Sequence, residues 1–179
     1  MRAMHLLVGI AGIALPALAQ PHAAEPLLHL SASFDLVVHA SYAKTAPLFG
    51  PEAERLWAGS HWSPEFIHPQ PARDVEGAVF TIQRGDRKAV WVNTLFDLDT
   101  GRFQYVYFMP ELMVTVIDVR LQRDGADSTK VNVVYTRTAL TAEGNEHVSS
   151  MIAVDKKAGK EWEQAIDDYL GGRPIDCRH

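Results

Sequence analysis

The sequence predicts an α+β fold in which a curved antiparallel sheet of about six or seven strands wraps around one long C-terminal helix. Apolar residues recur every three or four positions between about residues 143 and 170, as in a helix with one buried face. Residues 77–138 read as alternating strands joined by short turns, and one strand followed by two short helices precedes them. Because the sheet needs a cover for its apolar face, we expect the long helix to pack against it.

Residues 1–19 have the pattern of a secretory signal peptide. Arg2 precedes an apolar run over residues 6–15, and a small-x-small pattern ends at Ala19. The run is shorter than the roughly 20 residues that a permanent membrane anchor needs. We therefore expect cleavage after about Ala19, a periplasmic or secreted protein without a stable membrane anchor, and a flexible tether at residues 20–27. A buried amphipathic helix is the alternative reading of the run.

Charge and length limit the remaining possibilities. The chain has 17 Lys and Arg against 22 Asp and Glu, a formal charge of −5, and loss of the leader with its Arg2 makes it −6. An acidic chain without a basic run is poorly suited to nucleic acid. Residues 28–171 are long enough for one domain with its own core, and residues 172–179 form a tail. Cys177 is the only cysteine, so it either stays free or pairs with another molecule.

The first half of the domain holds one strand, two short helices and a loop. Apolar and polar residues alternate over Leu28–His39, which predicts a strand. Short helices are expected over Ser41–Phe49 and over residues 52–56, and the charged residues of the second, Glu54 among them, are expected to face solvent. Residues 57–76 show no period and are predicted to form an ordered loop.

Five strands follow, each joined to the next by a turn with recognisable chemistry. Thr115, Ile117 and Val119 alternate with polar or mixed neighbours in the fourth, so one face of the sheet should be apolar. Gly85-Asp86 and Asp124-Gly125 are typical hairpin turns. The five strands are predicted at residues 77–83, 88–96, 102–109, 114–123 and 130–138.

The terminal helix is predicted over Glu143–Leu170. Thr141 can cap its start, and Gly171 follows its last periodic residue. Gly144 and Gly159 each weaken a helix by about 1 kcal/mol relative to Ala, so a bend near Gly159 is compatible with this prediction. Strand, two short helices, antiparallel strands and a long final helix together describe a helix-grip fold.

Four segments support this interpretation by resemblance: Pro47–Trp57, His61–Phe66, Glu76–Phe80 and Val133–Leu140. With the order of elements, they resemble the SRPBCC superfamily, which includes START lipid-transfer domains, pollen-allergen-like proteins and polyketide cyclases. The resemblance covers about residues 30–170. It implies a deep apolar cavity between sheet and helix, in which members hold hydrophobic ligands and some perform chemistry. The secretory leader departs from the usual intracellular member.

Large flat or flexible side chains suit an apolar ligand, and polar tips on some of them could orient a carbonyl or hydroxyl group. The alternative is that closure of the sheet on the helix uses many of these side chains as core. The candidate ligand-binding residues are Trp62, Phe66, Trp91, Asn93, Tyr105, Tyr107, Tyr135, Met151 and Trp162.

His61, Glu65 and His68 are the candidate catalytic residues. Spacings of four and three would place them on one helical face, where zinc or an acid–base pair could use them. Pro64 and the Pro after His68 oppose a continuous helix, so structural hydrogen bonds under the loop are the main alternative. No metal site or cofactor is predicted.

The sequence therefore favours an exported binding protein that encloses a small hydrophobic or amphipathic molecule. One rival is an enzyme of the cyclase or dehydratase kind, in which His61 or Glu65 transfers protons. Another is a structural or partner-binding protein with a filled core. An enzyme needs a titratable group that points into the cavity, whereas a filled core would leave no cavity at all.

Overall fold

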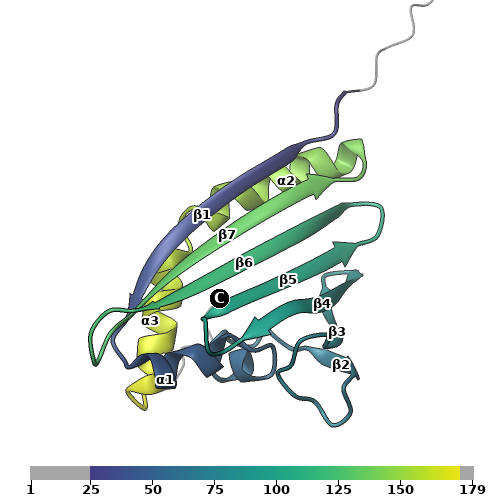
Figure 1. Ribbon diagram of the computed structural model, residues 1–179. Helices are drawn as coiled ribbons and strands as arrows, with labels where there is room; N and C mark the ends of the chain where they lie inside the picture. The colour runs from purple at the N-terminus through teal and green to yellow at the C-terminus, as the bar shows by residue number, and fades with distance from the viewer. Residues whose placement is uncertain (1–24, 174–179) are drawn as a thin grey trace, which may run out of the picture.

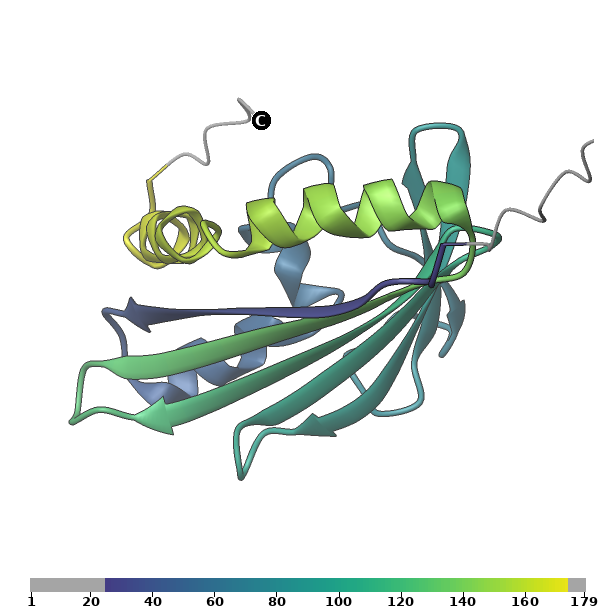
Figure 2. The same cartoon turned by 90° about the horizontal axis from the view of Figure 1, so that it is seen from above.

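The computed structural model describes residues 25–173 and contains one seven-stranded antiparallel sheet with two consecutive helices packed on it (Figure 1). Figure 2 shows the first of these helices lying across the curved sheet and the second nearly end-on. The expected leader, most of the expected tether and Cys177 lie outside the described residues. Residues 25–28 and 171–173, at the two ends of the described chain, belong to no helix or strand.

The strands follow one another in space as β1-β7-β6-β5-β4-β3-β2, with every neighbouring pair antiparallel. The first strand of the chain therefore pairs with the last, with Phe34 opposite Val133. The bounds are β1 His29–Val38, β2 Glu65–His68, β3 Val79–Arg84, β4 Arg87–Asp97, β5 Arg102–Met109, β6 Met113–Arg123 and β7 Thr129–Ala139.

The inner face of the sheet is the one that sequence alternation predicts. In β6, Thr115, Ile117 and Val119 are buried, whereas Arg120 and Gln122 on the other face are exposed. The register with β7 places Ile117 opposite Tyr135 and Val119 opposite Val133, so the same faces meet. Burial of each large apolar side chain contributes about 1.5–3 kcal/mol, and this inner face is the main part of the core.

Three short helical turns follow β1: the α-helix α1 (Tyr42–Thr45) and the 3₁₀ helices η1 (Ala46–Phe49) and η2 (Ala53–Leu56). They confirm the two predicted short helices. The side chain of Asp74 accepts hydrogen bonds from the backbone N–H groups of Glu52 and Ala53, at 2.6 and 3.1 Å, and so holds the start of η2. The expectation that Glu54 faces solvent is wrong, because η2 docks with that side chain inward.

The predicted helix at residues 143–170 is two helices, α2 (Ala142–Asp155) and α3 (Gly159–Leu170), separated by a tight turn. Thr141 caps α2 as predicted, accepting a hydrogen bond from the N–H of Gly144 at 3.2 Å. At Gly159 a Cβ atom would lie 2.7 Å from the backbone oxygen of Asp35 in β1. The glycine lets α3 approach β1 closely. The turn between α2 and α3 changes the direction of the chain, so that the apolar face of α3 packs on β1.

The predicted loop at residues 57–76 contains the short edge strand β2, which the sequence analysis missed. Phe66 of β2 lies opposite Phe80 of β3, and their rings stack with centroids 5.4 Å apart. Four residues are too few for a period to emerge from sequence. Over residues 25–173, the structure contains no helix whose length and apolar character would allow it to cross a bilayer.

Candidate functional site

A cavity of about 450 Å³ lies between the inner face of the sheet, the helices α2 and α3, and the segment 54–62. Strands β3 to β7 all contribute side chains to its wall. Some lining residues are exposed, among them His61, Val154 and Gln164, so the cavity communicates with solvent between the 58–62 loop and the helices. The interior is not filled solid, which weighs against the filled-core alternative.

Most of the predicted ligand-binding residues line this cavity. Phe66 does not, because it packs on Phe80 at the sheet edge. Asn93 does not either: its side-chain N–H₂ donates to the backbone oxygen of Val75 at 3.1 Å and ties the preceding loop to β4. The seven that line the cavity are Trp62, Trp91, Tyr105, Tyr107, Tyr135, Met151 and Trp162.

Aromatic rings form two walls of the cavity. Trp91 stacks on Tyr107 with ring centroids 4.2 Å apart, and Trp62 meets Trp91 edge-on at 5.3 Å. On the other side, Trp57 at the end of η2 meets Trp162 of α3 edge-on at 5.2 Å. All four tryptophans of the chain therefore line the cavity. Such walls are rigid and present apolar faces to a ligand.

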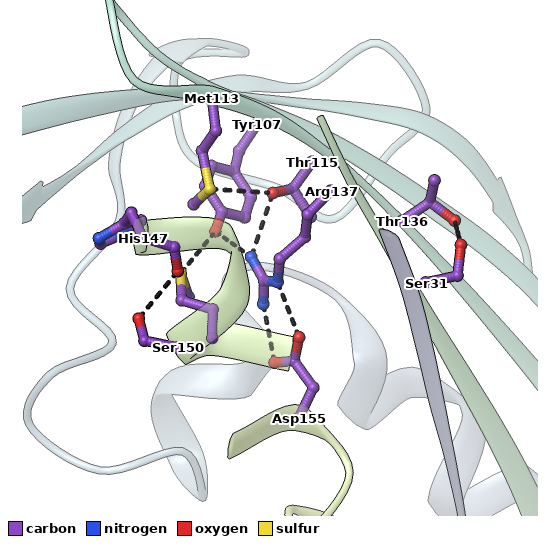
Figure 3. Close-up of polar contacts among 10 residues, drawn as sticks. Ser31, Tyr107, Met113, Thr115, Thr136, Arg137, His147, Ser150 and Asp155 are labelled. Carbon is purple, nitrogen blue, oxygen red and sulfur yellow. Dashed lines mark hydrogen bonds and ion pairs between the residues drawn. The ribbon is translucent and has the colours of Figure 1, made fainter. Parts of the chain in front are cut away.

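A buried ion pair closes one part of the wall, and sequence reasoning missed both partners (Figure 3). Arg137 of β7 donates from Nε and Nη2 to the two carboxylate oxygens of Asp155, at 2.7 and 2.8 Å. Its Nη1 donates to the hydroxyls of Tyr107 and Thr115, at 2.5 and 3.1 Å. Both ionic side chains are almost completely buried.

These contacts define the role of Arg137 in the cavity wall. Burial lowers the pKa of its guanidinium, but the hydrogen bonds to Asp155, with the electrostatic effects of Tyr107, Asp155 and Tyr135, outweigh burial and hold that pKa above its ordinary value. The guanidinium also lies 4.7 Å from the ring centroid of Tyr135. Most of its donors are already engaged, so Arg137 acts as a strut between β7 and α2 and not as an open anion site.

Glu54 is a further charged residue of the lining that sequence reasoning missed. Its side chain is 7% exposed and lines the cavity, and within residues 25–173 the carboxyl has no hydrogen-bond or ion-pair partner. Burial raises the pKa of Glu54 well above its ordinary value, and the nearby carboxylate of Asp74 raises it further. The cavity thus combines an apolar lining with one unpaired buried carboxyl group.

The structure does not assemble the predicted catalytic group. Glu65 and His68 are exposed residues of β2, and Glu65 forms a surface ion pair with Lys88 at 2.9 Å. The predicted helical face does not exist, because this segment is extended. Only His61 of the three lines the cavity, at an exposed position where its backbone oxygen accepts a hydrogen bond from Arg84 at 2.9 Å. The described part of the chain holds no group of three His, Cys, Asp or Glu side chains that could bind a metal ion.

Comparison with known proteins identifies the fold. No protein-family model and no curated protein matches the sequence. Truncated norcoclaurine synthase from Thalictrum flavum matches with a TM-score of 0.61 and 13% identity, over 80% of this chain and 94% of that one. A hypothetical protein from Helicobacter pylori matches with a TM-score of 0.61 and 10% identity, over 78% and 87%. The chain has a helix-grip fold.

A further structure of the Thalictrum flavum enzyme, in complex with dopamine and hydroxybenzaldehyde, also matches this fold. Its TM-score is 0.59 and its identity 13%, over 84% of this chain and 91% of that one. A helix-grip protein can therefore bind small molecules. At such low identity the likeness establishes the fold and not the ligand.

Proposed function

We propose that the chain is an exported binding protein of the SRPBCC type, which encloses a small hydrophobic or amphipathic molecule between its sheet and its two C-terminal helices. The observation that carries this proposal is the cavity of about 450 Å³ with its aromatic walls. Its volume falls within the roughly 300–1,000 Å³ typical of small-molecule sites, which combine a mostly apolar lining with a few polar groups. Small-molecule binding by a helix-grip neighbour supports the same class of function.

The enzyme alternative proposed proton transfer by His61 or Glu65, and the structure places Glu65 outside the cavity. Glu65 is exposed and paired with Lys88, so it cannot transfer protons inside the cavity. His61 reaches the lining only at an exposed position. Binding is therefore the function that the geometry supports best.

Export rests on the sequence of residues 1–19 and is part of the proposal. Expression of the full chain in a Gram-negative host, followed by fractionation and intact-mass measurement, tests it. We expect a periplasmic protein that begins at about Gln20. Recovery of the uncleaved chain from the cytoplasm alone would contradict export without touching the binding proposal.

A matched pair of alanine substitutions tests binding. Ala165 lines the cavity from α3, whereas Ala153 is exposed on α2 and lies outside the lining. We expect the wild type to bind one equivalent of a neutral apolar probe, 2-naphthylmethanol, in isothermal titration calorimetry. Ala165→Trp should weaken binding by at least about tenfold because the indole fills the site, and Ala153→Trp should leave it unchanged. Absence of binding to the wild type, or equal binding to both variants, would refute the proposal.

A further inference from the structure

We propose that Glu54 makes the cavity selective for ligands with a basic nitrogen, whose ammonium group pairs with the Glu54 carboxylate while the apolar body lies among the tryptophans. This inference rests on the proposed binding function and specifies its ligand class. It follows from the burial of Glu54, its missing counter-ion, and the charges and rings around it.

Glu54 is an exception among the buried charged residues of the described chain. The other two, Arg137 and Asp155, neutralise each other through two hydrogen bonds. Glu54 is buried to a similar degree, yet none of residues 25–173 offers it a hydrogen bond or an opposite charge. A buried carboxyl without a partner is unfavourable unless a partner arrives or the group stays protonated.

The groups around Glu54 do not supply that partner. Asp74, the charged group that acts on Glu54, is itself acidic, and its oxygens already accept hydrogen bonds from the backbone at the start of η2. The hydroxyl of Tyr105 donates to the backbone oxygen of Phe49 and is used. A cationic group on a ligand would meet the Glu54 carboxyl in the lining and would also be attracted by the charge of Asp74, which acts on Glu54, so this part of the cavity favours a cation.

An aromatic surface adjoins the carboxyl. Trp57 follows Glu54 by three residues and is the C-cap residue of η2. Both residues line the cavity, and Trp57 contacts Trp162 within one of its walls. An ammonium group beside Glu54 would therefore also lie near indole faces, which attract cations.

Protonation allows such a ligand to enter without carrying a charge through the apolar cavity. Burial raises the pKa of Glu54 and so favours its neutral acid form before a ligand binds. A neutral amine can then accept the carboxyl proton: the O–H bond breaks, an N–H bond forms, and an ammonium–carboxylate pair remains. No other reactant is needed. The pair is strong because it forms away from bulk water.

Arg84 is the group that would favour the opposite ligand. It lines the cavity, and no acidic side chain within residues 25–173 pairs with it. However, Arg84 is only partly buried and already donates to the backbone oxygen of His61. It therefore gains less from a ligand than Glu54 does. Acidic side chains also outnumber basic ones along the lining: Glu54, Asp155, Glu161 and Asp168 against Arg84 and Arg137.

Three probes with one apolar body test the inference on the mature wild-type protein: 2-naphthylmethylamine, 2-naphthylmethanol and 2-naphthoate. In isothermal titration calorimetry at pH 7, we expect the amine to bind at least about tenfold more tightly than the alcohol, and the carboxylate most weakly. Glu54→Gln, which keeps the shape and removes the charge, should abolish the preference for the amine. Its affinity for the alcohol should stay within about twofold of the wild type.

The outcomes separate this inference from the binding proposal. If the alcohol binds and the amine binds no better, the inference fails while binding stands. If 2-naphthoate binds most tightly and Arg84→Met removes that preference, Arg84 and not Glu54 selects the ligand. A preference for the amine that survives Glu54→Gln also refutes the assignment. If no probe binds the wild type, both proposals fail. If Glu54→Gln does not fold, the comparison of probes on the wild type still tests the preference for a basic nitrogen, and equal binding of the amine and the alcohol still refutes the inference.

Discussion

The guanidinium of Arg137 and the carboxylate of Asp155 face each other as two parallel forks, with N–O distances of 2.7 and 2.8 Å (Figure 3). Asp155 is the last residue of α2, and Arg137 belongs to β7 on the inner face of the sheet. This pair therefore fixes the end of α2 to the sheet just before the chain turns into α3. It is also part of the cavity wall.

We predict that Asp155→Ala lowers the free energy of unfolding by about 3–5 kcal/mol, because it leaves the guanidinium of Arg137 buried without its counter-ion. Urea denaturation measures the loss. Glu65→Ala, which removes an exposed pair with Lys88, is the control and should change stability by less than about 1 kcal/mol. The double variant Arg137→Met/Asp155→Leu should recover most of the loss, since it removes both charges together. A loss below about 1 kcal/mol in Asp155→Ala would show that the pair is not structural.

Glu54 should make stability depend on pH. Its pKa is raised in the folded protein, so its proton stabilises the fold below the ordinary pKa near 4.5, and this contribution is lost as the pH rises through the raised pKa. Glu54→Gln carries no such proton. We predict equal stability of the two proteins at pH 4 and an advantage for Glu54→Gln that grows to about 1–3 kcal/mol at higher pH. Urea denaturation between pH 4 and pH 8 measures the difference, and a difference independent of pH would contradict the assignment.

Gly159→Ala should destabilise the protein although Ala is the better helix former by about 1 kcal/mol. The added methyl group would lie 2.7 Å from the backbone oxygen of Asp35 and 3.3 Å from the ring of Phe34, so α3 must move away from β1. We expect a net loss of about 1–3 kcal/mol in urea denaturation. Ser149→Ala, at an exposed position of α2, is the control and should lie within about 0.5 kcal/mol of the wild type. Equal effects of the two substitutions would mean that α3 is not held closely.

His39 should titrate above its ordinary range. Its ring Nδ1 lies 2.6 Å from a carboxylate oxygen of Asp167 in α3, and this hydrogen bond, with the charge of the carboxylate, raises the pKa of His39. The pair stabilises the fold below pH 6.5, and its contribution disappears as the pH rises through the raised pKa. An NMR titration should show the ring returning toward its ordinary pKa in Asp167→Asn. Asp168→Asn, which affects the pair with Arg173, should leave His39 unchanged.

Sequence reasoning recovered the sheet except for its edge strand β2, because the other strands are long enough for alternation to be visible, as in β6. The sequence also indicates that Arg137 is buried, although the sequence analysis did not predict it. The inward phase of β7 runs through Val131, Val133 and Tyr135 and continues directly to Arg137. A charge at the next inward position indicates a buried partner, and Asp155 occupies a buried position of α2.

Other features could not be read from local sequence because packing decides them. Glu54 lies beside the exposed Arg55 and Leu56, and only the docking of η2 through Asp74 turns it inward. The apolar periodicity continues across residues 156–158, although the helix ends there. The close approach of Gly159 to β1 gives α3 a different direction from α2. Neither a short 3₁₀ helix nor a contact over such a sequence separation leaves a local pattern.

The placement of every tryptophan in the cavity lining gives the protein an intrinsic optical reporter. Trp57 and Trp162 contact each other on one wall, and Trp62 and Trp91 on the other. No indole elsewhere in the chain adds a constant background to the emission. Entry of any molecule that displaces water from these rings should therefore change the wavelength or intensity of the intrinsic fluorescence, so that unlabelled compounds can be screened against the native chain.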